Sequence, residues 1–243
     1  MGDVLSNKMD DYVIGIVGGM GSYATVKFFE RIIDSYPVER EWERPRIVID
    51  NKCTMPSRVR SILYDENTDL LISELTDSVR GLMDMGATKI VLACNTSHCF
   101  LPEVLKNVPE AEDKIVHIIT SCAEMIKRDG LNKVFLMATE GTLLSKIYEN
   151  TFEPYGIECV AATEDDFPIM REYIEAVKQK QITDEMKDDF VNYINNAETD
   201  AVILGCTELP ILYAELGDKK AEITKKIYDP LDAALLKIKN GTV

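Results

Sequence analysis

The chain has 243 residues, of which 46% are hydrophobic, so it can form one large domain or two domains of about 120 residues with real cores. Its 27 Lys and Arg residues stand against 42 Asp and Glu residues, which gives a net charge of −15. This charge argues against nucleic acid and anionic membranes as partners, because both require basic surfaces. No apolar run approaches the roughly 20 residues that span a membrane.

Six cysteines are spread along the chain, and none of them forms a Cys-x-x-Cys pair. This pattern is unlike the short, disulfide-rich scaffolds of secreted proteins. Residues 1–11 contain no apolar segment of a secretory signal. We therefore expect a reducing, cytoplasmic environment with free thiols. Because the chain has only 2 histidines, without paired spacing to other ligands, no metal site is expected.

The first half of the chain alternates between short β-prone apolar runs and longer amphipathic segments. The former are typical of buried strands and the latter of helices with one apolar face. Strands are predicted at 12–17, 46–51, 89–92 and 114–119, and helices at 23–35, at 69–85 and from the residues after Cys94 to Leu105. A loop at 52–58 follows the second strand, because Pro56 disfavours a helix there.

The second half repeats this order. Strands are predicted at 133–138, 157–161 and 200–204, with a short one ending within 227–230, and helices at 121–128, 142–152, 166–180, 183–195 and 231–238. Strands that alternate with helices favour parallel sheets with right-handed crossovers. We therefore expect an α/β fold of two similar doubly wound parallel-sheet domains. A pseudo-twofold axis would relate them, with the active site in the cleft between them.

One pattern occurs once in each predicted domain: a strand, a small residue, a cysteine and capping residues. The first domain, residues 1–115 plus 212–243, carries Cys94, and the second, residues 116–211, carries Cys206. Ligands bind at the carboxyl ends of parallel strands, and a helix N-terminus there stabilises a thiolate. The repeat favours two cysteines that face each other across the cleft. The alternative is two buried core cysteines.

The first strand leads into a glycine-containing loop at 18–21, where the backbone can approach a ligand closely. Met20 and Gly21 are candidate binding residues for this reason. The glycines do not follow the G-x-G-x-x-G order of dinucleotide-binding folds, and the Gly-Lys-Ser/Thr of a P-loop is absent, so nucleotide binding is disfavoured. Asn51 and Thr139 lie at the ends of other predicted strands and are further candidates, although Thr139 could simply cap a helix.

Arg58 follows the second strand, and its planar guanidinium could hold a carboxylate. A solvated surface arginine is the alternative. His98 lies about one helical turn beyond Cys94 and could tune its thiolate, but packing or capping is the favoured interpretation. His117 is predicted to be a core residue within a strand.

Two thiols on opposite sides of a small molecule suit the inversion of a carbon acid. One thiolate takes the α-proton from one face, and the other thiol donates a proton to the opposite face. The pair must hold one thiolate and one thiol and must exchange these states between the two directions.

Three ordered motifs resemble the aspartate/glutamate racemase family, and most closely its aspartate racemase branch. They are Gly-Gly-Met-Gly at 18–21 followed by Ala-Thr, Ala-Cys-Asn-Thr-Ser-His at 93–98, and Gly-Cys-Thr-Glu at 205–208. The resemblance extends from Val13 to about Leu236. It implies a PLP-independent racemase without a cofactor, two α/β domains with an interdomain site, and commonly a homodimer. Cys94 and Cys206 fall on the two catalytic positions.

The resemblance also implies roles in binding a small acidic amino acid. In the aspartate branch, an Arg and a Lys recognise the side-chain carboxylate, and their positions match Arg58 and Lys178. Asn95, Thr96 and Thr207 match positions that hold the α-carboxylate.

Two positions depart from the family's pattern. Ser22 stands where the aspartate branch usually has a proline, which puts the contacts of the glycine-containing loop in doubt. Glu208 stands where glutamate racemases have a histidine, and the Asp-Ser-Gly type motif with which those enzymes open is absent.

The leading hypothesis is a cofactor-independent racemase that interconverts L- and D-aspartate. The alternatives with the same fold are a glutamate racemase or a broad-specificity amino-acid racemase. Other reactions of the superfamily are those of maleate isomerases, hydantoin racemases and arylmalonate decarboxylases, and the last keep only one of the two cysteines. A non-catalytic amino-acid-binding protein is the alternative from a different class, but it would have no use for paired thiols.

Overall fold

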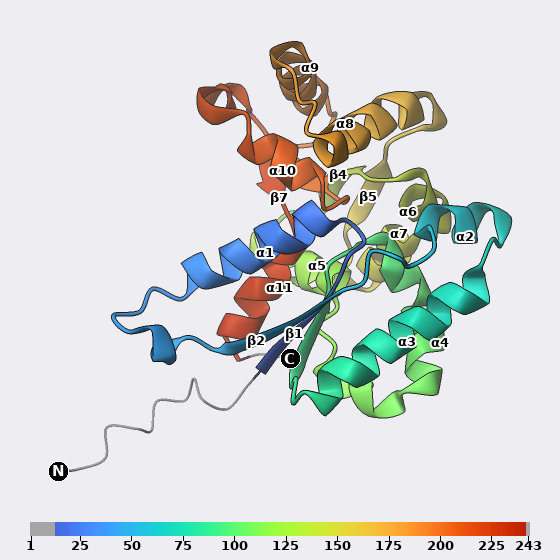
Figure 1. Cartoon of the computed structure of the whole chain (residues 1–243). Helices are drawn as coiled ribbons and strands as arrows, with labels where there is room; N and C mark the ends of the chain where they lie inside the picture. The colour runs from blue at the N-terminus through green and yellow to red at the C-terminus, as the bar shows by residue number, and fades with distance from the viewer. Residues whose placement is uncertain (1–12, 242–243) are drawn as a thin grey trace.

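The computed structural model describes residues 13–241 and contains two parallel β-sheets surrounded by helices (Figure 1). The prediction that residues 1–11 contain no secretory signal concerns residues outside this range. The α/β class with two parallel sheets is confirmed.

The first sheet has the strand order β2-β1-β3. Its strands are β1 (Val13–Gly18), β2 (Arg46–Asn51) and β3 (Lys89–Leu92). β1 pairs in parallel with both neighbours, with Ile16 opposite Ile49 on one side and Val91 on the other. This central position explains why β1 is a nearly continuous apolar run, since helices cover both faces of such a sheet.

The second sheet has the order β5-β4-β6-β7 and is also entirely parallel. Its strands are β4 (Lys133–Met137), β5 (Glu158–Ala161), β6 (Ala201–Leu204) and β7 (Lys226–Tyr228). β7 pairs with β6, although the predicted domain division assigns its residues to the first domain. That division stays a prediction. At β7 it differs from the sheets, because this strand belongs to the second sheet.

Helices connect the strands and cover the sheets. They are α1 (Ser22–Ser35), α2 (Arg58–Tyr64), α3 (Thr68–Asp84), α4 (Leu101–Asn107), α5 (Ile118–Arg128), α6 (Glu140–Ser145), α7 (Ile147–Phe152), α8 (Phe167–Gln179), α9 (Asp184–Asn195), α10 (Leu209–Ala214) and α11 (Pro230–Lys239). Within residues 13–241, no helix is long and apolar enough to cross a membrane.

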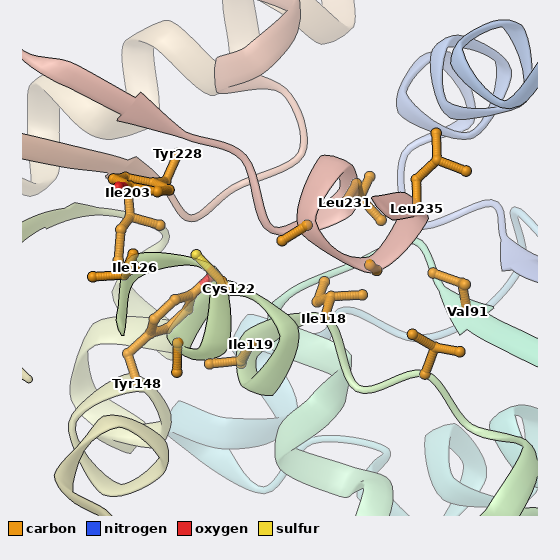
Figure 2. Close-up of a cluster of buried hydrophobic side chains, with 14 of the residues drawn as sticks. Val91, Ile118, Ile119, Cys122, Ile126, Tyr148, Ile203, Tyr228, Leu231 and Leu235 are labelled. Carbon is orange, nitrogen blue, oxygen red and sulfur yellow. The ribbon is translucent and has the colours of Figure 1, made fainter. Parts of the chain in front are cut away.

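One apolar cluster joins the two sheets through α5 and α11, which lie between them (Figure 2). Ile118 and Cys122 of α5 pack in this cluster with Leu231 of α11, and all three are fully buried. Val91 of β3 and Ile203 of β6 belong to the same cluster. Each buried aliphatic side chain contributes about 1.5–3 kcal/mol, so this shared core fixes the two sheets relative to one another.

The predicted strand at 114–119 is wrong. Only Ile115 makes a single parallel bridge, to Ile90, and α5 begins already at Ile118. His117 caps this helix, because its Nδ1 accepts a hydrogen bond from the backbone N–H of Thr120 at 3.2 Å. Only Ile118 and Ile119, the end of the apolar run, belong to the buried face of this helix, and Val116 and His117 lie in the connection before it. His117 therefore lies outside any strand.

Two local differences affect the site. The sequence did not predict α2, which begins at Arg58 because Ser57 caps it by accepting from the backbone N–H of Arg60. The segment after Cys94 is a 3₁₀ turn, Thr96–Phe100, which continues into α4.

Candidate active site

Cys94 and Cys206 line the same cavity, at the carboxyl ends of β3 and β6. Both side chains are almost buried, with relative exposures of 6% and 8%. The cavity has a volume of about 90 Å³. A single water molecule needs about 10–15 Å³ of such space, so roughly six to nine non-hydrogen atoms fit. This is close to the size of a small amino acid.

Most of the residues singled out in the sequence lie around this cavity. Besides the two cysteines, they are Met20, Arg58, Asn95, Thr96, Thr139, Lys178 and Thr207. Asn51 and Gly21 do not line it. The amide of Asn51 instead donates hydrogen bonds to Ser22 and Cys53, at 3.3 Å in each case.

Gly21 acts on the cavity through Glu208. A β-carbon at position 21 would lie 2.3 Å from Glu208 Oε1, so a side chain there would displace the carboxylate from its present position. The glycine therefore leaves room for this buried carboxylate, which lines the cavity and is only 3% exposed. Ser57, Val59 and Ile174 also line the cavity. The sequence signal for Glu208 was its place directly after Cys-Thr at a strand end, but it was not counted as a site residue.

Glu208 holds Cys206 in its thiol form. The Sγ–H of Cys206 donates to Glu208 Oε2 at 3.0 Å, and the hydroxyl of Thr207 donates to the same oxygen at 3.2 Å. Burial, first, and then the negative charge of Glu208 raise the pKa of the Cys206 thiol well above its usual range. Cys206 is thus the member of the pair that carries a proton.

Cys94 is positioned through its backbone carbonyl. Ser97 Oγ donates to this oxygen at 2.7 Å, and His98 Nδ1 lies 2.9 Å from it. Nε2 of His98 accepts from the backbone N–H of Ile118 at 3.4 Å, so Nδ1 is the protonated nitrogen and donates to Cys94. Burial, and then the neighbouring His117, lower the pKa of His98 to about 3. A neutral His98 orients the backbone of Cys94 and brings no positive charge to this side of the cavity.

Asn95 lines the cavity and contains a buried hydrogen-bond donor without a partner. Its Oδ1 accepts from the hydroxyl of Tyr148 at 2.6 Å, which fixes the orientation of the amide. Its Nδ2 is buried and makes no hydrogen bond among the described residues. Such a donor costs about 1–3 kcal/mol unless an acceptor reaches it.

Three threonine hydroxyls meet at the wall of the cavity. Thr96 lies 3.0 Å from Thr139 and 2.8 Å from Thr142, and these last two lie 3.0 Å apart. Each hydroxyl can donate only once, so the three mutual contacts use all three donors, and one hydroxyl can turn toward a ligand only by giving up one of these contacts. These hydrogen bonds also connect the turn after β3 with the beginning of α6, the helix that follows β4 of the second sheet.

The two candidate cations both have protein partners. Arg58 donates to the backbone oxygens of Met20 at 2.8 Å and Pro56 at 3.0 Å, which leaves further guanidinium N–H groups for a carboxylate. Lys178 forms an ion pair with Glu175 at 2.7 Å. Burial by itself would lower the pKa of Lys178, but the hydrogen bond to Glu175 and the charge of Glu208 raise it, so Lys178 remains a cation.

The Asp/Glu/hydantoin racemase family model matches residues 17–238, nearly the whole chain. The chain belongs to this family. Within residues 13–241 there is no cluster of three or more His, Cys, Asp or Glu residues that could hold a metal ion.

Known racemases are similar to this chain over most of its length. The solved aspartate racemase of Picrophilus torridus superposes with a TM-score of 0.78 at 27% identity, covering 96% of this chain and 95% of its own. A glutamate racemase of Lactobacillus acidophilus is 27% identical over 92% of this chain and 78% of its own length. A broad specificity amino-acid racemase of Bacillus subtilis is 27% identical over 81% and 86%. The chain is therefore an amino-acid racemase by family, with relatives of differing specificity.

Proposed function

We propose that this protein interconverts L- and D-aspartate by a cofactor-independent, two-thiol mechanism. The observation that carries the proposal is the pair Cys94 and Cys206, two buried thiols on the wall of one cavity the size of an amino acid. A binding protein needs no such pair, whereas inversion of an α-carbon needs a base on one face and an acid on the other.

The surroundings of the cysteines support different resting roles for the two thiols. Cys206 is a thiol that donates to Glu208, so it is the acid. The pair needs one thiolate, and Cys94 is therefore the base that takes the α-proton from one face of the substrate. Cys206 then delivers its proton to the opposite face, and the pair is left in the reverse state. Turnover in the other direction starts from that reverse state.

The remaining groups bind and orient the substrate. The α-carboxylate lies near Asn95, Thr96 and Thr207, which line the cavity at the ends of β3 and β6. The side-chain carboxylate lies near Arg58 and Lys178, two cations in a strongly acidic protein. Charge-assisted hydrogen bonds of this kind contribute about 1.5–3 kcal/mol each.

The similarity to the aspartate racemase of Picrophilus torridus supports aspartate as the substrate, and the similarity to a glutamate racemase supports glutamate as the second candidate. Both reactions use the same two thiols, so they differ only in how the cavity receives one additional methylene.

The deciding experiment incubates the full-length protein with L- and D-aspartate in D2O. Loss of the α-proton signal together with loss of optical rotation is expected from both enantiomers. Activity should survive dialysis, chelators and carbonyl reagents, and thiol alkylation should abolish it unless substrate is bound. Binding of aspartate without deuterium exchange would instead identify an amino-acid-binding protein. Inactivation by hydroxylamine that PLP reverses would refute the cofactor-free mechanism.

Two further parts of the proposal are a homodimer and a cytoplasmic location. Sedimentation equilibrium tests the first and cell fractionation the second.

A further inference from the structure

A second, larger chamber adjoins the catalytic cavity. Its volume is about 230 Å³, against about 90 Å³ for the cavity that contains the thiols. The two spaces share a wall formed by Ser57, Val59, Thr139, Ile174 and Lys178. The outer chamber lies between the beginning of α2 and one face of α8.

The chamber combines apolar walls with a charged rim. Phe167, Met170 and Ile174 of α8 supply apolar surface, and Met170 and Ile174 are themselves almost buried. At the rim, Arg171 is paired with Glu140, and its side chain is 65% exposed. The space is thus suited to an apolar chain that enters from the inner cavity.

The cations of the inner cavity do not require a carboxylate from the substrate. Arg58 already donates to two backbone oxygens, and Lys178 is already paired with Glu175. When a neutral side chain passes Arg58 and Lys178, both cations keep these protein partners. The cost of several kcal/mol for an unpaired buried charge therefore does not arise.

We propose that the outer chamber receives the distal part of substrate side chains longer than that of aspartate, and that unbranched, apolar amino acids are a second substrate class. This inference rests on the proposed function, because it places the substrate with its side chain toward Arg58 and Lys178. Lys178 lines both spaces, so a longer side chain in this orientation is directed toward the outer chamber.

A series of amino acids with increasing side-chain length tests the inference. The full-length protein is assayed by α-proton exchange in D2O with aspartate, norvaline, norleucine and 2-aminoheptanoate. Norvaline matches the length of the aspartate side chain, and the last two extend beyond it by one and two methylene groups. Each methylene that enters an apolar chamber should raise kcat/KM by about fourfold, the equivalent of about 0.8 kcal/mol of transfer free energy. Turnover of aspartate with a flat or falling series would overturn the inference and leave the proposed function intact. No exchange with any amino acid would overturn both.

A matched pair of variants locates the effect. Arg171→Trp adds bulk at the chamber rim, whereas Arg171→Ala breaks the same ion pair with Glu140 without adding bulk. The Trp variant should lower kcat/KM for norleucine about tenfold or more and change that for aspartate by less than about threefold. The Ala variant should change neither by more than about threefold. An equal loss for both substrates in the Trp variant would show that the chamber is only the access route, and the inference would be wrong.

Discussion

The thiol of Cys206 donates a hydrogen bond to the carboxylate of Glu208 at 3.0 Å, and both side chains are buried at the end of β6. No other described hydrogen bond connects a proposed catalytic sulfur to a carboxylate. A buried negative charge at this distance opposes ionisation of the thiol. The contact therefore makes the two cysteines unequal, as a mechanism with one acid and one base requires.

Glu208→Gln should lower the pKa of Cys206, because the amide removes the charge and keeps the size of the side chain. The pH–rate profile should shift to lower pH by about one unit or more in the direction for which Cys206 is the base. Exchange rates from L- and D-aspartate between pH 6 and 10 measure this shift. Glu215→Gln, an exposed change on the same segment, is the control. Identical profiles for Glu208→Gln and the wild type would contradict the assigned role.

Cys94→Ala and Cys206→Ala should each slow racemisation by at least about 10³-fold, because inversion loses either its acid or its base. Residual exchange in D2O should favour opposite enantiomers in the two variants, since each keeps a thiol on one face only. Its amount is expected to be small, because removal of one thiol changes the ionisation of the other. Cys159→Ala, a cysteine outside the cavity, serves as the control. Near-normal racemisation by either active-site variant would show that the missing cysteine is structural.

Arg58→Ala should reduce kcat/KM for aspartate by about 10- to 150-fold, the equivalent of about 1.5–3 kcal/mol for a charge-assisted contact. The effect on alanine, if it is turned over, should be much smaller. Arg60→Ala on the same helix, where Arg60 is exposed and paired with Glu66, should change neither substrate measurably. An equal loss for aspartate and alanine would mean that Arg58 only supports the loop through the backbone oxygens of Met20 and Pro56.

The buried pair His98 and His117 should make the fold sensitive to acid. Burial is the largest cause that lowers the pKa of His98 to about 3 and that of His117 to about 4, from the ordinary 6.5. Below pH 6.5 the unfolded chain therefore binds protons that the folded protein does not. The free energy of unfolding should fall as the pH drops from 6.5 toward 4, by up to about 2 kcal/mol per histidine at pH 5.

Urea unfolding at pH 7.5 and pH 5 measures this loss. His117→Asn retains a helix-capping residue and removes one titrating group, so the difference between the two pH values should shrink by up to about 2 kcal/mol. The same pH dependence in the variant and the wild type would assign the acid sensitivity to other groups.

The sequence by itself determined the parallel α/β class, most strands and the two cysteines that end β3 and β6. These features depend on local patterns, namely apolar runs of strand length and a motif repeated at a strand end. The same local pattern failed at 114–119. There the cap at His117 begins a helix at Ile118, so the run is divided between a single bridge at Ile115 and the first residues of α5, which pack between the sheets.

Only the tertiary structure decided how the site is completed. Glu208 reaches Cys206 because Gly21, far away in the chain, leaves room for its carboxylate. Arg58 begins a helix and donates to backbone oxygens, and the outer chamber exists because α2 and α8 come together from opposite halves of the chain. Contacts between residues distant in sequence depend on how the two sheets pack through their shared core, and no local pattern of residues encodes that packing.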